Sequence, residues 1–397
     1  MAKATIRDIE ISSKRVLVRV DFNVPLDEET GVITDDSRIR ATLPTIRYLT
    51  SRGARVILCS HLGRPKGKVV EKLRLATVAQ RLSQILGQPV KVTKDCVGSE
   101  VERVAAELKP GDVLLLENIR FHPEEEKNDA AFAKSLASLA DVYVNDAFGT
   151  CHRAHASVVG ITNYLPTVAG LLLEKEIKTL GSILENPARP FAALLGGAKV
   201  SDKIGMIENI MGKVDYILVG GGMAATFLKA ESYETGQSLV EGDKLKVAVG
   251  LFEKASRSGV RLLLPVDVVI AGEINPEAKS ETVSIEDIPQ DKRIVDIGPK
   301  TVRIFQKSLL KCKTVFWNGP MGIYETPQFA AGTKTLARVL ANLDATTVIG
   351  GGSTAEVIIE MGLADKMSFV STGGGASLDF LSGKALPGIE ALPDRES

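Results

Sequence analysis

The sequence has few cysteines, no excess of one charge and no long apolar run. Its four cysteines lie far apart without a C-x-x-C pair, so neither a disulfide framework nor a zinc site is indicated. Lys and Arg total 49 and Asp and Glu total 49, so bulk charge provides no surface for nucleic acid or anionic membranes. No apolar run approaches the roughly 20 residues of a membrane span, and the N-terminus has no signal-peptide core. We expect a soluble, cytoplasmic protein that binds neither nucleic acid nor membrane.

The sequence also lacks the common short signatures of nucleotide-dependent enzymes. Its nearest match to a P-loop, residues 63–69, has too short a spacing and no Ser or Thr to hold magnesium. Protein-kinase signatures are absent. Low-complexity segments and repeats of fixed period are absent too. Any anion-binding site must therefore be inferred from the placement of individual residues.

Short apolar runs rich in Val, Ile and Leu recur along the chain, each followed by a Gly- or Asn-containing turn and a stretch with helical spacing. This pattern is typical of parallel α/β sheets whose strands are buried on both faces. The runs of the first half are residues 15–20, 55–60, 90–92, 112–117 and 141–146, and those of the second half are 191–196, 215–220, 260–265, 314–319, 346–351 and 367–372.

Two domains are the natural expectation, because 397 residues exceed what one hydrophobic core usually supports. A helix predicted over 171–185 ends at Asn186-Pro187, where proline forbids its continuation. We place the boundary there, which gives an N-terminal domain at 1–170, an interdomain helix at 171–186, a C-terminal domain at 187–386 and an irregular tail at 387–397. One large sheet with this helix packed on its face is the alternative.

Polar side chains follow the strands of the first half. In open parallel sheets, ligands bind beyond the carboxyl ends of the strands, so these residues are candidates for a shared site. Several arginines at one edge would form a pocket for a small polyanion, although each alone would be a solvated surface charge. The histidines have no obvious carboxylate partner, so general-base catalysis is not expected. The residues are Asp21, Asn23, His61, Arg64, Arg120, His152, Arg153 and His155, and Arg38 could join them from a helix that opens near Ser37.

Glycine runs follow the strands of the second half instead. They lie at 196–197, 220–222, 350–352 and 373–375, and Lys199 and Lys203 are close to the first of them. Without Cβ atoms, such turns let backbone N–H groups and helix N-termini approach phosphate oxygens. Four runs in one half predict a polyphosphate ligand there, although any single run could be a tight connection without one.

Two other function classes stay open at this point. Residues 220–225 and 350–355 match the loose dinucleotide fingerprint G-x-G-x-x-A, which would suit a dehydrogenase. Neither match has a clear ribose-binding acid at the right offset, and a nicotinamide enzyme would not need so many arginines. A non-catalytic nucleotide-binding module would leave the arginine edge of the first half unexplained.

Seven longer motifs together resemble the phosphoglycerate kinase family along nearly the whole chain. They are RVDFNVP at 19–25, SHLGRP at 60–65, LENIRF at 116–121, NDAFGTCHRAHAS at 145–157, GGAKVSDKI at 196–204, FWNGPMGIYE at 316–325 and STGGGASLDFLSGKALPG at 371–388. The resemblance implies two Rossmann-like lobes, each a parallel sheet flanked by helices, joined by a helical hinge. It implies reversible phosphoryl transfer from 1,3-bisphosphoglycerate to ADP with Mg²⁺, giving 3-phosphoglycerate and ATP, by a monomer.

The resemblance also implies roles for individual residues. The 1–170 domain would bind phosphoglycerate and the 187–386 domain the nucleotide. Substrate contacts would come from Asp21, Phe22, Asn23, Arg38, His61, Leu62, Gly63, Arg64, Arg120 and Arg153. Nucleotide contacts would come from Gly197, Lys203, Gly220, Gly221, Gly222, Gly298, Asn318, Pro320, Glu325, Gly350, Gly351, Gly352 and Ser353, with Glu325 at the ribose. Catalytic contacts to the moving phosphoryl group would come from Arg38, Lys199, Gly373, Gly374 and Gly375.

One position departs from the family pattern. Ser353 stands where an Asp near the magnesium of the nucleotide is expected, so either phosphates and water hold the metal or another acid such as Glu356 replaces it. We therefore assign no residue to the metal. The implied reaction needs no general base, because the attacking and leaving oxygens are already ionised, so charge stabilisation and lobe closure would carry it.

Overall fold

The structure, a computed structural model, describes residues 2–395. The chain forms two compact units, of which unit 1 comprises the residues up to 178 and those from 385 on, and unit 2 comprises residues 179–384. Each unit contains its own six-stranded parallel sheet. The alternative of one large sheet is therefore wrong, and the predicted α/β class is confirmed.

The sheet of unit 1 has the strand order β3-β4-β2-β1-β5-β6. Its strands are β1 (Arg15–Arg19), β2 (Arg55–Cys59), β3 (Val90–Val92), β4 (Val113–Leu115), β5 (Val142–Asn145) and β6 (Thr167–Ala169). Five of these lie within the predicted runs. The sixth, β6, is only three residues long and was not predicted, because so short a segment carries no periodicity.

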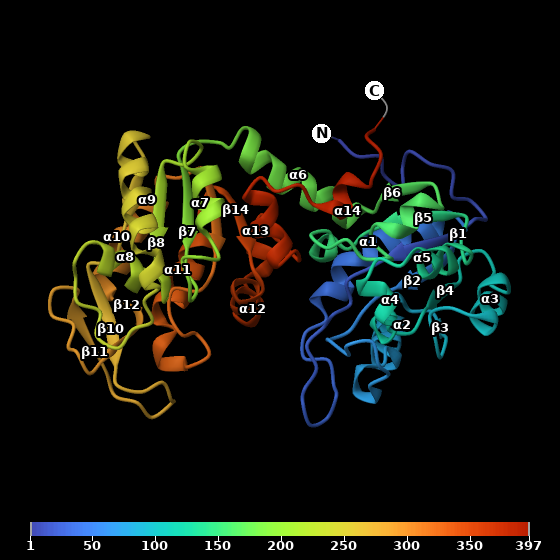
Figure 1. Ribbon diagram of the computed structural model, residues 1–397, viewed down its shortest axis with the longest axis horizontal. Coiled ribbons are helices and arrows are strands. Elements are labelled where there is room, and N and C mark those ends of the chain that lie inside the picture. The colour runs from blue at the N-terminus through green and yellow to red at the C-terminus, as the bar shows by residue number, and fades with distance from the viewer. Residues whose placement is uncertain (1, 396–397) are drawn as a thin grey trace. The chain divides into compact units, whose positions relative to one another are not determined.

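Helices cover both faces of this sheet (Figure 1). They are α1 (Ser37–Ser51), α2 (Ala76–Leu86), α3 (Ser99–Ala106), α4 (Pro123–Glu126) and α5 (Ala130–Ala137). Alternate strand residues point to opposite faces, so Val16 and Val18 pack in one core cluster with residues of α1 and α2. Leu17 packs in the other cluster with residues of α3 and α5.

Unit 2 repeats this architecture with the strand order β15-β14-β13-β7-β8-β9. The strands are β7 (Phe191–Leu195), β8 (Tyr216–Val219), β9 (Arg261–Leu263), β13 (Thr314–Asn318), β14 (Thr346–Gly350) and β15 (Phe369–Val370). The helices are α7 (Ile204–Ile210), α8 (Met223–Ala230), α9 (Leu245–Arg257), α10 (Pro299–Leu309), α11 (Ala331–Leu340), α12 (Gly352–Glu360) and α13 (Gly375–Leu381). All six strands lie within predicted runs.

Unit 2 also contains a small antiparallel sheet that the sequence did not predict. It consists of β10 (Asp267–Ala271), β11 (Ser280–Ser284) and β12 (Arg293–Ile297), in the order β11-β10-β12. The segment after β13 contacts this sheet, since Ile323 donates its backbone N–H to Val295 at 2.9 Å. The outer strand β11 is mostly exposed and polar, so a search for buried apolar runs misses it.

The predicted helix over 171–185 is confirmed as α6 (Leu171–Glu185). Its N-terminus is held by the end of β5, because Asp146 Oδ1 accepts the backbone N–H groups of Leu172 and Leu173 at 2.9 and 3.1 Å. Thr45 Oγ1 accepts the N–H of Leu171 at 2.9 Å. Side chains thus satisfy the first donors of the helix, which otherwise have no partner within it.

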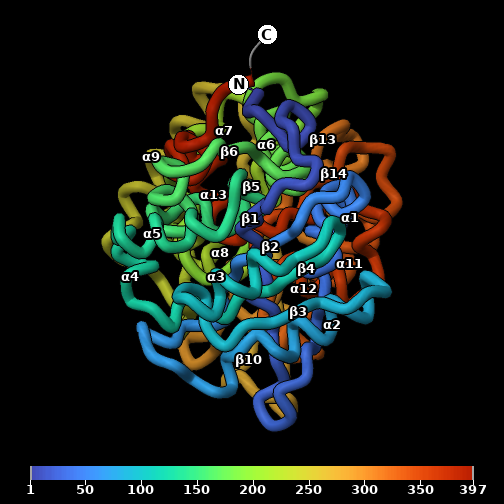
Figure 2. The backbone as a smooth tube through the Cα atoms, turned by 90° about the vertical axis from the view of Figure 1, so that its right-hand side faces the viewer, coloured from blue at the N-terminus to red at the C-terminus, as the bar shows by residue number. Residues whose placement is uncertain are grey.

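The C-terminal segment from residue 385 on returns to unit 1. Expected to be irregular, it forms the short helix α14 (Pro387–Glu390). Gly388 donates its N–H to Cys151 at 2.9 Å, and Asp394 pairs with Lys3 at 2.9 Å, so the two ends of the chain run side by side (Figure 2). Within residues 2–395 no helix combines the length and apolar character that a bilayer span requires.

Candidate active site

The polar residues predicted in unit 1 gather around Asp21, which directly follows β1. Arg38, from the first turn of α1, donates to the Asp21 carboxylate. His61, which follows β2, has its Nδ1 atom 3.9 Å from Asp21 Oδ1. Arg19, the last residue of β1, is fully buried and places Nη2 3.1 Å from the same His61 nitrogen. Strand ends and one helix start thus bring two arginines, a carboxylate and an imidazole together.

These neighbours determine which groups are charged. Burial alone would raise the pKa of Asp21, but the nearby charges of Arg38 and Arg19 hold it below its ordinary value. Burial lowers the pKa of His61 well below its usual value, and the adjacent arginines act in the same direction, although Asp21 opposes them. At neutral pH, Asp21 is therefore ionised and His61 is neutral.

Arg120 adds a third buried guanidinium, from the short 3₁₀ helix η2 (Ile119–Phe121) that follows β4. Its side chain is 6% exposed, and Nη1 donates to the carbonyl of Gly63 at 3.1 Å. Its Nε atom has no hydrogen-bond partner among the described residues, although Glu126 Oε1 lies 3.5 Å away. Burial, with Arg19 and Arg153 nearby, lowers the pKa of Arg120 to about 10. A buried cation that is not fully paired is costly unless an anion completes it.

Two asparagines hold the turn that connects these groups. Asn23 Oδ1 accepts the N–H of Gly63 at 2.7 Å, and Asn118 Nδ2 donates to the carbonyls of Leu62 and Leu73 at 2.8 and 2.9 Å. The sequence interpretation included Asn23 but missed Asn118, although Asn118 lies in the quoted LENIRF motif. The turn at 62–64 is thus anchored from two sides.

The remaining predicted substrate residues differ in burial. Phe22 and Leu62 are buried at 0% and 2% exposure, so their side chains belong to the core. Arg64 is exposed. Arg153 is partly buried and donates Nε to His152 Nε2 at 3.1 Å. Among the described residues, Arg38 is thus the one arginine of the set with a hydrogen bond to a carboxylate, whereas Arg120 donates to a carbonyl and Arg153 to His152.

A buried chain of hydrogen bonds, which the sequence did not indicate, supports the cluster. Arg19 donates Nε to Ser157 Oγ at 2.9 Å, and Ser157 donates its hydroxyl and N–H to the Glu125 carboxylate at 2.6 and 2.9 Å. In the sequence, the only signs of this chain are an arginine inside an apolar run and a glutamate inside an acidic run. The chain fixes the position of Arg19 beside His61.

The sequence offered no obvious carboxylate partner for the histidines, but the structure places a carboxylate near three of them. His61 lies near Asp21, His122 Nε2 is 2.6 Å from Asp95 Oδ1, and His155 Nδ1 is 3.7 Å from Glu125 Oε1. These partners come from distant parts of the chain. Burial and the nearby arginines lower the pKa of His155 to about 4, so proximity to a carboxylate does not make it a base of ordinary strength.

In unit 2 the first two glycine runs and the segment after β13 meet at the carboxyl ends of β7, β8 and β13. Gly197 and Gly221 donate their N–H groups to the carbonyls of Pro320 and Met321, each at 2.9 Å. A Cβ atom on Gly319 would lie 2.3 Å from the Gly196 carbonyl oxygen. These glycines are thus required by the close approach of three backbone segments.

The glycines at the starts of α12 and α13 have no such packing reason. Gly352 and Gly375 adopt no left-handed φ, and a Cβ atom on either would meet nothing within 4 Å. Gly374 has a φ of +53° and also faces open space. Helix N-termini with open space in front of them can receive an anion.

Two polar groups of unit 2 are buried without a partner. Lys203 is 6% exposed, and among residues 2–395 no hydrogen bond or ion pair involves its ammonium. Burial lowers the pKa of Lys203, and Asp202 opposes this shift. Asn318 Nδ2 is buried and has no hydrogen-bond partner among the described residues. Both groups belong to motifs quoted above, and both are candidates to contact a ligand.

Other predicted nucleotide residues have structural surroundings of their own. A Cβ atom on Gly298 would lie 2.2 Å from the side chain of Asp267, so packing alone requires this glycine. Glu325 and Ser353 are exposed. Glu356, the acid that could replace the expected Asp, accepts the Tyr324 hydroxyl at 2.6 Å and is therefore already engaged.

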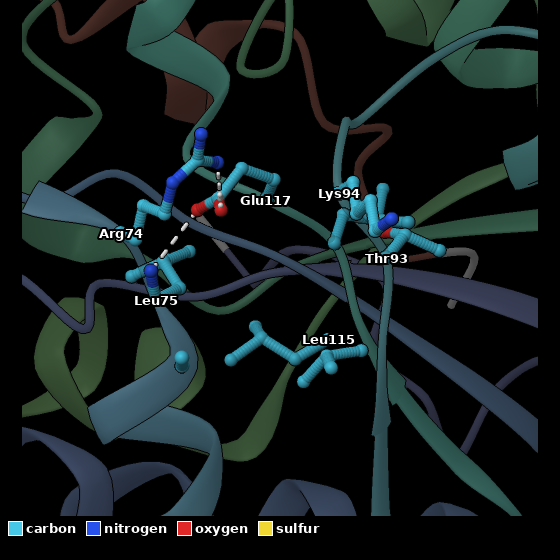
Figure 3. A pocket seen from close by; sticks show the side chains of 9 residues that line it. Arg74, Leu75, Thr93, Lys94, Leu115 and Glu117 are labelled. Carbon is cyan, nitrogen blue, oxygen red and sulfur yellow. Dashed lines mark hydrogen bonds and ion pairs between the residues drawn. The ribbon is translucent and has the colours of Figure 1, made fainter. Parts of the chain in front are cut away.

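A pocket in unit 1 lies apart from all of these residues (Figure 3). It measures about 350 Å³, and its lining is mostly apolar. Arg74 and Glu117 lie on one side and Thr93 and Lys94 on the other, with Leu115 between them. None of its lining residues belongs to the predicted site, so shape alone would have selected a different place.

Comparison of the chain with known proteins shows its family. A family model described as phosphoglycerate kinase matches residues 6–384. The chain belongs to the phosphoglycerate kinase family. It is 57% identical over 395 residues to phosphoglycerate kinase from Moorella thermoacetica and 57% identical over 399 residues to that from Dictyoglomus turgidum, with both partners covered completely in each comparison.

Solved structures agree. The phosphoglycerate kinase from Coxiella burnetii superposes with a TM-score of 0.85 at 41% identity, and that from Pyrococcus horikoshii with a TM-score of 0.87 at 33% identity, each covering 98% of both chains. The chain is thus a phosphotransferase with a carboxyl group as acceptor, acting in glycolysis and gluconeogenesis. The dehydrogenase and the non-catalytic nucleotide-binding module are excluded as alternatives.

Proposed function

We propose that unit 1 binds the phosphoglycerate and unit 2 the nucleotide, each through the residues predicted above. The observation that carries the first assignment is Arg120, a buried guanidinium with other arginines beside it and without a complete set of partners. The phosphate of 3-phosphoglycerate would complete it. Arg64 and Arg153 would supply further donors to the same phosphate.

Arg38 has a different role in this proposal. The ionised Asp21 fixes its guanidinium, with a side chain that is 26% exposed and thus accessible to a ligand. It would face the substrate carboxylate and neutralise the charge that develops when this group gains or loses the phosphoryl group. The neutral His61 would contribute a hydrogen bond to the substrate without adding another positive charge.

In unit 2, Lys203 and the open helix starts would hold the phosphates of the nucleotide. Lys203 is buried without a counter-ion in hydrogen-bond contact, so a phosphate would stabilise its charge. Asn318 Nδ2 would donate to the nucleotide, which removes an unsatisfied buried donor. The exposed Lys199 and the turn at 373–375 would contact the phosphoryl group in transfer.

The family uses a magnesium–nucleotide, and the donors of unit 2 do not provide a protein-held metal site. Ser353 offers a hydroxyl where the family pattern has a carboxylate, and Glu356 is engaged by Tyr324. Mg²⁺ prefers carboxylate and phosphate oxygens and keeps several of its waters. We therefore propose that the ion arrives with the nucleotide and is held by phosphates and water.

The proposed setting follows from the reaction. Glycolysis runs in the cytoplasm, and the four cysteines are all free and buried, as a reducing compartment allows. Each proposed set of ligand contacts is supplied by this one chain, so we propose that it acts as a monomer. Light scattering of the purified protein with both substrates present checks the oligomeric state.

The test is a coupled assay of ATP-dependent phosphorylation of 3-phosphoglycerate across a magnesium titration. We expect turnover that requires 3-phosphoglycerate. Ser353→Asp adds a carboxylate and is expected to lower the magnesium concentration needed for half-maximal rate several-fold, whereas Ser353→Ala is expected to leave it unchanged. An unchanged requirement in Ser353→Asp would show that position 353 does not lie beside the ion. A higher requirement in Ser353→Ala would show that the Ser353 hydroxyl itself holds the ion, against the proposal that phosphates and water do so.

A further inference from the structure

A group of metal-ligating side chains lies in unit 1, outside the proposed substrate contacts. Asp95, Cys96 and His122 each offer one ligand atom, and these atoms all lie within 4.8 Å of one another. Among residues 2–395 this is the only group of three or more such side chains that close together. We propose that these three residues bind one Zn²⁺ ion, with a water completing the coordination.

The surroundings hold the three ligands in place. The backbone carbonyl of Asp95 accepts the Thr93 hydroxyl at 2.7 Å, and Asp95 Oδ1 accepts the backbone N–H of Cys96 at 2.6 Å. The His122 ring stacks on Phe132, with ring centres 5.2 Å apart and an interplanar angle of 29°. A ligand set whose members are already oriented loses less conformational entropy when the metal binds.

The ligand distances require only a local adjustment. Tetrahedral zinc has bonds of about 2.0–2.3 Å, so its ligand atoms lie roughly 3.4–3.6 Å apart. His122 Nε2 and Asp95 Oδ1 are now 2.6 Å apart and would separate by about 1 Å as the ion binds between them. The proton of this hydrogen bond is released to water. The thiol lies within 4.8 Å of both other ligand atoms and would move toward the ion.

The chemistry of the ligands selects the metal. A thiolate with an imidazole and a carboxylate suits Zn²⁺, whereas Mg²⁺ prefers oxygen ligands alone. The site is therefore distinct from the magnesium that enters with the nucleotide. Binding converts the Cys96 thiol to a thiolate and releases its proton to water.

Cysteine spacing gave no sign of this site in the sequence. Only one ligand is a cysteine, and His122 is 27 positions from Asp95. The two segments meet because β3 and β4 are neighbours in the sheet and each is followed by one of the ligand-bearing turns. The site also differs from the pocket of Figure 3, whose lining includes none of Asp95, Cys96 and His122.

The experiment is a titration of the metal-free full chain with Co²⁺, a zinc substitute whose bond to a thiolate gives a charge-transfer band in the near ultraviolet. We expect the band to appear with one ion per chain and to disappear when Zn²⁺ displaces the cobalt. His122→Asn, a change at a partly exposed side chain, should weaken Co²⁺ binding at least about tenfold, as expected when a ligand is lost.

Cys96→Ser should abolish the band, and Asp95→Asn should weaken binding without abolishing it. Cys312→Ser, which removes another buried cysteine in unit 2, is the matched control and should retain the band. Circular dichroism checks that each variant is folded, and His122→Asn keeps the test decisive if Cys96→Ser does not fold. The absence of a band in the parent, or equal binding in His122→Asn, would overturn the proposal.

Discussion

Arg38 and Arg40 lie two positions apart on α1 and face different surroundings. Arg38 donates to the buried Asp21, whereas Arg40 is 54% exposed and pairs with Asp36 one turn earlier. Exposed ion pairs of this kind contribute little to stability. The two arginines thus offer a matched comparison between a proposed catalytic cation and a surface charge.

We predict that Arg38→Ala lowers kcat by about 10² to 10³, the loss typical of one missing transition-state donor. Arg40→Ala should keep kcat within about twofold of the parent, since its ion pair is exposed. Steady-state kinetics with 3-phosphoglycerate and ATP measure both, and circular dichroism confirms that the variants are folded. Equal losses in the two variants, or near-parental turnover in a folded Arg38→Ala, would refute the role of Arg38.

The pKa of His155 depends on how close Arg120, Arg19 and Arg153 lie to its imidazole. Its pKa of about 4 arises from burial and from Arg120, Arg19 and Arg153 nearby. The unfolded chain gains a proton on this residue near pH 6.5, whereas the native state gains it only near pH 4. Stability therefore falls as the pH drops from about 6.5 to 4, and this contribution changes no further below that range.

We predict that NMR titration of the four histidines finds one imidazole with a pKa near 4, and that His155→Gln removes its signal. Adding 3-phosphoglycerate should raise this pKa, because the bound phosphate offsets the positive charge of the arginines. A pKa near 6.5 in the free protein would show that the arginines do not surround His155.

At the scale of elements, the glycines that follow the strands of unit 2 fall into two kinds that the sequence cannot distinguish. Gly319 has a φ of +92° and lies against the backbone of Gly196, whereas Gly375 begins α13 facing open space. The first kind is explained by packing within unit 2. Packing within the protein does not explain the second kind. We therefore propose that these glycines leave space for the phosphate of a ligand.

We predict opposite effects of Gly→Ala changes at the two positions. Gly319→Ala should lower the free energy of unfolding by about 1–3 kcal/mol, because alanine is strained there. Gly375→Ala should leave stability unchanged and lower kcat at least about tenfold, because the methyl group occupies space meant for a phosphate. Gly250→Ala on α9, where a Cβ atom also meets nothing within 4 Å, is the control. It should keep full activity and should not lower the free energy of unfolding.

Thermal unfolding and steady-state kinetics on the three variants provide the measurements. Loss of activity in Gly319→Ala through instability would agree with the packing explanation. Full activity in Gly375→Ala would contradict the assignment of this turn to the transferred phosphoryl group.

The sequence predicted elements best where burial imposes a pattern. The central strands and α6 were predicted because apolar runs, glycine turns and Pro187 mark them locally. The outer strand Ser280–Ser284 of the antiparallel sheet was missed because it is polar and exposed, whereas β10 and β12 are apolar runs that the prediction overlooked. The supporting residues Arg19, Glu125 and Asn118 were missed because their partners are distant in the chain, so no local spacing records them.

At the scale of the whole molecule, the chain separates its tasks. Unit 1 collects arginines, and unit 2 collects glycine turns and a buried lysine, each around its own core and sheet. The expectation that the units close on their substrates stays a prediction. The division of binding between them can be tested without any knowledge of that motion.

The measurement is calorimetric binding of 3-phosphoglycerate and of MgADP to Arg120→Met and Lys203→Met, two changes that replace a buried cation with an apolar side chain of similar length. Lys246→Met, at an exposed lysine of unit 2, is the control and should bind both ligands like the parent.

We predict that Arg120→Met weakens the binding of 3-phosphoglycerate at least about tenfold and leaves the affinity for MgADP within about twofold of the parent. Lys203→Met should weaken the binding of MgADP and leave that of 3-phosphoglycerate nearly unchanged, as expected when one charge-assisted contact is lost. Loss of the same ligand in both variants, or of neither, would contradict the assignment of the phosphoglycerate to unit 1 and of the nucleotide to unit 2.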